Sequence, residues 1–76
     1  MKFKDFLEKV DGNTHIEVVV NVGGIEFRKI DVANTFRKTK ELDDMDVSQI
    51  GVTYATLGVS RQIKLARLQV KLEKTN

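Results

Sequence analysis

The sequence predicts an α+β fold, in which an N-terminal helix packs on an antiparallel sheet of about four strands. Three observations support this prediction. Apolar residues recur at helical spacing near the start of the chain, two-residue periodicity follows in several later segments, and glycine or acidic residues separate the segments. The predicted order is helix, hairpin, connector, hairpin, and 76 residues leave room for one small domain, residues 1–76.

The first element is an amphipathic helix. Its apolar residues fall at i, i+3, i+4 and i+7, and they are Phe3, Phe6, Leu7 and Val10. We expect Asp11-Gly12 to end the helix, because glycine adopts the left-handed conformation without steric cost. A helix this short does not persist alone in water, so its apolar stripe must dock on the rest of the chain.

A β-hairpin follows the helix. Residues 15–22 alternate and are rich in β-branched side chains, which is typical of a strand. Gly23-Gly24 permits the two positive φ angles of a two-residue turn, and the return strand begins at Ile25.

The return strand changes parity part of the way along. Ile25 and Phe27 share one parity, whereas the later apolar residues share the other. A simple register places Lys29 opposite Val18 and Asp31 opposite Ile16, on the core side. We therefore expect a β-bulge at Arg28-Lys29, which returns the apolar residues to the core.

The connector, residues 33–46, has the weakest pattern. Asn34 or Thr35 can cap a short helix over residues 36–42, and a loop is the alternative. The acidic segment 43–46 then forms a polar turn.

The last two segments form a second hairpin. Ile50, Val52 and Tyr54 alternate with small or polar residues, and Gly58 lies in the next turn. Residues 63–72 have helix-forming composition, but only a strand places the apolar residues at 66, 68, 70 and 72 on one face, with Ile63 and Leu65 on the opposite parity. A parity change near Leu65-Ala66 predicts a second bulge.

The stretch 47–60 has no charged residue and no proline. Such a strand is prone to aggregation if it is exposed. We expect it to be a central, covered strand. If it instead lies at an edge, strand-to-strand homodimerisation is the natural outcome.

Several segments together resemble a known group of sequences. Residues 6–18 read Phe-Leu-Glu-x-Val-Asp-x-x-Thr-x-Ile-x-Val, and a glycine turn, an acidic segment over residues 42–47 and an alternating last strand follow. This order is similar to that of short uncharacterised proteins encoded by bacterial phages and mobile elements. The resemblance covers most of the chain. It implies a compact α+β domain with an accessory role in a phage or prophage, and it implies no catalytic residue.

The residues predict no catalytic, cofactor or metal site. The chain has no cysteine, and His15, its only histidine, lies on the outward parity of a strand. The acidic residues at 43, 44 and 46 lack the spacing of an EF-hand, and a solvated turn is the simpler interpretation. Gly23-Gly24 precedes a strand, unlike the glycines of a phosphate-binding loop. Neither Ser48 nor Ser60 has a base recognisable in the sequence. We therefore expect no enzyme.

The function expected is binding of another protein or of a second copy. The alternative is nucleic-acid binding through the basic C-terminal strand. The basic residues concerned are Arg61, Lys64, Arg67, Lys71 and Lys74. Basic side chains also protect sheet edges against aggregation, which is the simpler interpretation.

The charges also bear on location. The net charge is only +2, from 13 basic and 11 acidic residues, which is too small to imply a polyanionic partner. Charged residues interrupt the N-terminal segment, so no secretory h-region follows Lys2 and Lys4, and no window is apolar enough to span a membrane. The expected location is the cytoplasm.

Overall fold

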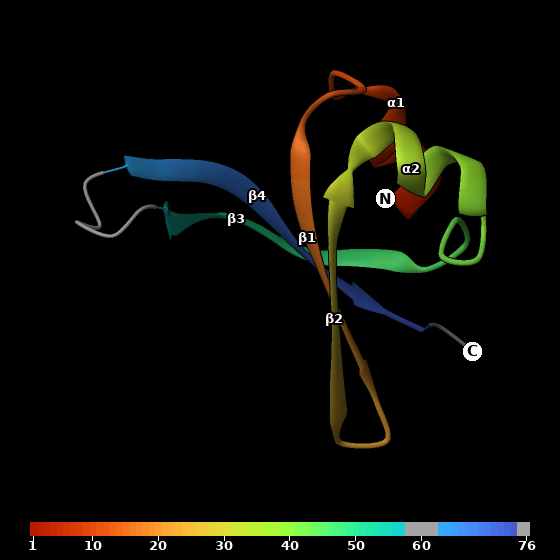
Figure 1. The fold of residues 1–76 in the computed structure, drawn as a ribbon. Helices are drawn as coiled ribbons and strands as arrows, with labels where there is room; N and C mark the ends of the chain where they lie inside the picture. Colours follow the sequence, from red (N-terminus) through yellow and green to blue (C-terminus); the bar gives the residue numbers. More distant parts are fainter. Residues whose placement is uncertain (58–62, 75–76) are drawn as a thin grey trace.

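A computed structural model describes residues 1–57 and 63–74 (Figure 1). The first half contains helix α1 (Phe3–Glu8) and strands β1 (His15–Val22) and β2 (Ile25–Val32). The second half contains helix α2 (Ala33–Thr39) and strands β3 (Asp46–Leu57) and β4 (Ile63–Glu73). The predicted order of helix, hairpin, connector, hairpin is confirmed, with a second helix in the connector. Neither of these two helices is long and apolar enough to cross a membrane.

The four strands form one sheet in the order β2-β1-β4-β3. The two hairpins are antiparallel, but β1 and β4 are parallel, with Ile16 opposite Leu68 and Val18 opposite Val70. The prediction of a fully antiparallel sheet is therefore wrong. In the parallel register the most apolar parts of β1 and β4 lie side by side, so that one layer of helices covers both.

The core lies between the helices and one face of the sheet, which we call the helix side. α1 buries its apolar stripe there, and the ring of Phe3 meets that of Phe36 from α2 edge to face, with 5.8 Å between centroids. The buried core residues are Phe3, Phe6, Leu7, Ile16, Val18, Ala33, Phe36, Val70 and Leu72. The docking of the N-terminal helix on the sheet is confirmed.

The end of α1 differs from the prediction. The helix ends at Glu8, Lys9 is right-handed, and the φ of Gly12 is not positive. The free carbonyl groups at the end of α1 are hydrogen-bonded by a residue far away in the sequence. The guanidinium of Arg37 in α2 donates to the carbonyl oxygens of Leu7 and Val10. Gly12 instead allows a close approach, because a Cβ there would collide with the side chain of Asn34.

The turn of the first hairpin is confirmed, with φ of 58° at Gly23 and 82° at Gly24. The predicted bulge at Arg28-Lys29 is wrong, because the register runs without a break and places Lys29 opposite Val18 and Asp31 opposite Ile16.

Both charges avoid burial because β2 is an edge strand. The Nζ of Lys29 lies 5.9 Å from the ring centroid of Phe36, and the Oδ1 of Asp31 accepts a hydrogen bond from the N–H of Val32 at 2.7 Å. The displaced apolar residue, Ile30, is exposed on the other face of the sheet.

The connector is helical, but it starts earlier than predicted. α2 begins at Ala33, and its N-cap residue is Val32 rather than Asn34 or Thr35. The helix ends at Thr39, and its C-cap residue Lys40 is left-handed with φ 58°.

The second hairpin confirms the strand over residues 63–72 and corrects two other predictions. No bulge occurs near Leu65-Ala66, and the register shift lies between Val47 and Gln49 instead. β3 lies at the edge of the sheet and not in its centre. Gly58 lies outside the described residues.

Candidate functional site

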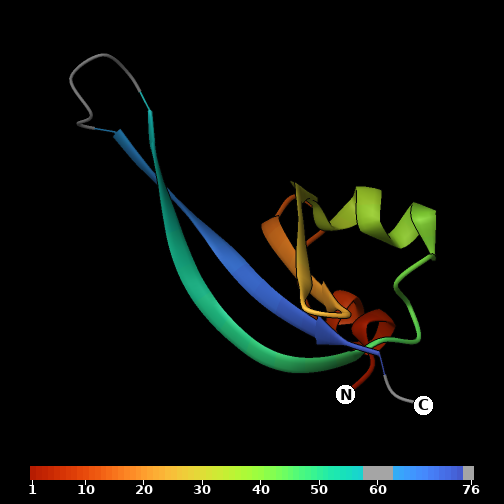
Figure 2. The same ribbon diagram turned by 90° about the horizontal axis from the view of Figure 1, so that it is seen from below.

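The most exposed part of the sheet is the far end of the second hairpin. Beyond Leu68, β4 no longer pairs with β1, so residues 53–57 and 63–67 form a two-stranded arm. Figures 1 and 2 show this arm extending away from both helices. The arm contributes to an elongated shape, with extents of 45 × 29 × 18 Å.

A row of apolar side chains leads from the core towards this arm. Ile50, Val52 and Tyr54 lie opposite Val70, Leu68 and Ala66, and therefore on the helix side. Their exposed fractions rise outwards, from 48% through 57% to 67%. We call these three residues the β3 strip. They are exposed because β3 is an edge strand, and the buried core residues of the sheet lie on β1 and β4.

The outer edge of β3 is covered only at its start. The N–H of Val47 donates a hydrogen bond to the carbonyl of Met1 at 2.8 Å, and Lys2 forms both a β-bridge and a 3.3 Å ion pair with Asp46. Ser48 occupies the register shift and donates its hydroxyl to the carbonyl of Lys71 at 3.0 Å. From Gln49 onwards, no strand among the described residues pairs with this edge.

The opposite edge of the sheet, β2, differs in its chemistry. It carries Glu26, Arg28, Lys29 and Asp31 within eight residues. Arg28 forms ion pairs of 3.4 Å with Glu26 and with Glu17 of β1. Charges of this kind discourage another strand from pairing, so β2 is protected where β3 is not.

The face of the sheet away from the helices, which we call the open face, centres on a buried acid. Glu17 is 7% exposed, and its carboxylate accepts from Arg28, Thr53 and Gln69 at 3.2 to 3.4 Å. These partners come from β2, β3 and β4, so Glu17 connects all four strands. This role of Glu17 was not predicted from the sequence, although a glutamate between isoleucine and valine in a strand is a signal for it.

The structure brings together only part of the predicted basic set. Arg67 and Lys71 lie on the open face, one on each side of Gln69, and the Nε of Arg67 is buried without a hydrogen-bond partner among the described residues. Lys74 is exposed just beyond β4. Lys64 pairs with Thr56 through the backbone of the arm, whereas its side chain and the whole of Arg61 lie outside the described residues.

The open face is mixed in charge. Glu17, Glu26 and Glu73 share it with Arg28, Arg67 and Lys71. A phosphate backbone approaching Arg67 or Lys71 therefore also meets carboxylates, which weaken its attraction.

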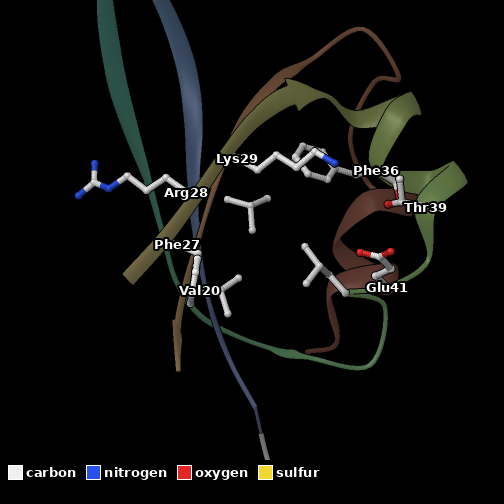
Figure 3. Close-up of a pocket in the computed structure, with 9 residues that line it drawn as sticks. Val20, Phe27, Arg28, Lys29, Phe36, Thr39 and Glu41 are labelled. Carbon is white, nitrogen blue, oxygen red and sulfur yellow. The ribbon is translucent and has the colours of Figure 1, made fainter. Parts of the chain in front are cut away.

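A groove of about 280 Å³ lies on the helix side, between the first hairpin and α2 (Figure 3). Its apolar lining comes from Val18, Val20, Phe27, Phe36 and Leu42. Figure 3 shows Lys29 reaching across it towards Phe36, Glu41 on the α2 side and Arg28 pointing away. Its size and lining suit a small apolar group.

The remaining candidate residues lie apart from one another. His15 is exposed at the start of β1. In the acidic turn, Asp44 lies 3.9 Å from Lys4, and Asp46 pairs with Lys2. Among the described residues, no three histidine, aspartate or glutamate side chains gather in a way that could hold a metal ion. Ser60 lies outside the described residues.

No known protein family, curated protein or solved structure matches this chain.

Proposed function

We propose that the protein is a non-enzymatic interaction module that binds a strand of a protein partner along the outer edge of β3. The observation that carries this proposal is the combination of an unpaired, uncharged β3 edge with the exposed β3 strip beside it. Strand addition at a free sheet edge is a recurring mode of protein recognition.

Both parts of a strand-addition site are present in β3. From Gln49 to Leu57 the edge offers backbone N–H and C=O groups to an incoming strand, and main-chain hydrogen bonds supply affinity in this mode. The β3 strip extends the apolar surface of the helix side towards the edge, so alternate side chains of the added strand gain apolar contacts. No charge in residues 47–57 opposes the approach.

Two polar side chains of the described sheet that could serve in catalysis are engaged in structure, which supports a role without catalysis. Glu17 is held by three side chains, and the hydroxyl of Ser48 donates to a backbone carbonyl. An acid–base site needs groups within reach of a substrate in a cleft. The exposed His15 is not part of the groove lining, and the hollow that it does line holds Arg67 as its other charged residue among those described, which does not act as an acid or base near neutral pH.

A titration with a generic strand tests the proposal. The probe is a synthetic peptide of alternating threonine and valine flanked by lysines, added to the isotopically labelled protein and followed by NMR. We expect shifts concentrated in the backbone amides of residues 49–57. The Val52→Lys variant should bind more weakly, whereas Ile30→Lys, the matched change on β2, should bind like the wild type. Shifts centred on β2, or equal effects of both variants, would contradict the proposal.

Nucleic-acid binding through the basic C-terminal strand is the alternative function. Its support is the common face of Arg67 and Lys71, and the carboxylates on that face count against it. Titration with DNA and RNA at low salt tests it, because electrostatic contacts are strongest there. Binding that Lys71→Glu abolishes would favour this alternative.

The biological setting that we propose is an accessory role in a bacterial phage or prophage, in the cytoplasm. It rests on the resemblance of residues 6–18 and of the later segments. The neighbourhood of the gene tests it, because a position outside phage and mobile-element genes would remove this part of the proposal.

A further inference from the structure

We infer that the partner strand is β3 of a second copy of this chain, paired antiparallel about a two-fold axis at Val52. This inference rests on the proposed function and names its partner. It would make a continuous sheet across two copies, with the β3 strips of both copies side by side on one face.

The register follows from the two-residue period of a strand. Side-chain direction and backbone hydrogen bonding both alternate along β3, so opposite residues of two identical antiparallel strands must share parity. Ile50, Val52 and Tyr54 of one copy therefore meet the same three residues of the other. An axis at Val52 places Val52 opposite its own copy and Ile50 opposite Tyr54. Pairs of an aromatic with a β-branched residue are favourable across strands.

In the alternative registers, at least one apolar residue of the β3 strip lies opposite a polar residue. Moving the axis to Gly51 places Tyr54 opposite Ser48, at the irregularity in β3. Moving it to Thr53 places Ile50 opposite Thr56. Only the axis at Val52 pairs all three apolar residues with one another, over a seam of residues 49–55 that lies beyond the part covered by Met1 and Lys2.

Charge selects a second copy as the occupant. An uncharged edge pairs best with an uncharged strand, because a charged partner strand would lose hydration without gaining an ion pair. Every copy of this chain supplies such a strand. The β2 edge is less suited to pairing with itself, because an axis at Arg28 places that arginine opposite its own copy, and an axis at Phe27 places Lys29 opposite Ile25. Self-association is thereby directed to β3.

The size of the seam sets the expected strength. A standard protein interface uses roughly 20–30 residues a side, and the seam 49–55 has far fewer. We therefore expect a dimer that forms and dissociates with concentration. Size-exclusion chromatography with light scattering, from about 10 μM to about 1 mM, should show the mass rising from 8.6 kDa towards twice that value.

Two charge variants test the location. Val52→Lys places two lysines opposite each other on the axis, and we expect it to raise the dimer dissociation constant at least about tenfold. Ile30→Lys adds the same charge at an exposed site on β2 and should leave the dimer unchanged. Circular dichroism checks that both variants fold. A strict monomer at about 1 mM, or equal effects of the two variants, would overturn the inference.

Single cysteines test the register, because the chain has no cysteine of its own. Opposite residues in an antiparallel pair have Cα atoms about 4.5 or 5.5 Å apart, within the range that a disulfide spans. Under mild oxidation Val52→Cys should cross-link to itself, and Ile50→Cys should cross-link preferentially to Tyr54→Cys. The control Ile30→Cys should remain reduced under these conditions. Cross-linking that is faster at Ile30 than at Val52 would refute the two-fold axis proposed.

The two proposals fail in different ways. If the generic peptide binds along β3 while the chain stays monomeric, the edge accepts strands but the partner is another protein, and the inference falls alone. If the peptide does not bind β3 and the chain also stays monomeric, both proposals fall. If the chain dimerises but Val52→Lys has no effect on the dimer, a different surface is used and the inference falls, whereas the peptide titration still decides the proposed function.

Discussion

At the scale of single residues, Phe6 tests the link between α1 and the sheet. Its side chain is 5% exposed and lies in the core with Phe3 and Phe36. Phe6→Ala removes apolar contacts and leaves a cavity, so we expect it to lower the free energy of unfolding by about 3 kcal/mol or more. Chemical denaturation followed by circular dichroism measures the loss.

The matched control is Phe27→Ala. Phe27 is the same residue type, but it is largely exposed on β2 at the rim of the groove. We expect it to lose much less stability than Phe6→Ala, about 1 kcal/mol or below. A loss below about 0.5 kcal/mol for Phe6→Ala would mean that α1 is not docked.

Two other residues act at long range. Arg37 of α2 satisfies carbonyl groups at the end of α1, and Glu17 joins all four strands on the open face. Both depend on partners far away in the sequence, and neither role appears in a local pattern. A side chain that belongs to no recognisable sequence pattern can therefore make the contacts that hold separate elements together.

At the scale of elements, the Gly23-Gly24 turn controls the first hairpin. Gly24 has φ 82°, a conformation that costs an L-residue about 1–2 kcal/mol. We expect Gly24→Ala to lower the free energy of unfolding by about that amount, measured by chemical denaturation.

Gly51→Ala provides a control for this turn. Gly51 is extended, and nothing lies within 4 Å of the position that a Cβ would take. Alanine should fit there without loss, since it also restricts the unfolded chain. If both variants lost the same free energy of unfolding, the positive φ of Gly24 would not be the cause of its loss.

The two edge strands show how context changes the meaning of a pattern. In β2, Lys29 and Asp31 share the parity of the core, and an internal strand would have had to bulge to remove them. At an edge they reach solvent or a nearby polar group, so the regular register survives. From Val47 onwards β3 has the opposite composition, uncharged at an edge, and this is the feature on which both functional proposals rest.

At the scale of the whole molecule, the described chain has a well-packed half and an extended half. β1 is paired on both sides and lies under the helices, whereas the arm has two strands and no helix above it (Figure 2). Local stability should follow this division, because regions with few buried contacts open most easily.

Hydrogen exchange along β4 measures that division within one strand. Residues 68–72 pair with both β1 and β3, whereas residues 63–67 pair with β3 alone. We expect the backbone amides of residues 68–72 to exchange at least about tenfold more slowly. Uniform protection along β4 would mean that the arm is as stable as the core.

Local patterns determined the element types. The helical spacing of Phe3, Phe6 and Leu7, the alternation in residues 63–72 and the paired glycines at 23 and 24 each predicted the observed element, because these signals depend only on near neighbours in the chain. Alternation in residues 50–54 likewise places the three residues of the β3 strip on one face of the sheet. The sequence alone could thus establish an α+β chain with two hairpins and a docked first helix.

Tertiary structure decided strand order, the parallel direction of β1 and β4, and the position of β3 at an edge. Two hairpins with the same internal pattern can join through any pair of strands, and the choice depends on which apolar faces the two helices cover together. The strand order places Lys29 on an edge strand, where its charge is not buried. It also gives Glu17 its hydrogen-bond partners and leaves the β3 strip exposed. These outcomes arise from contacts between residues far apart in the chain, which a local period of two or of 3.6 residues does not encode.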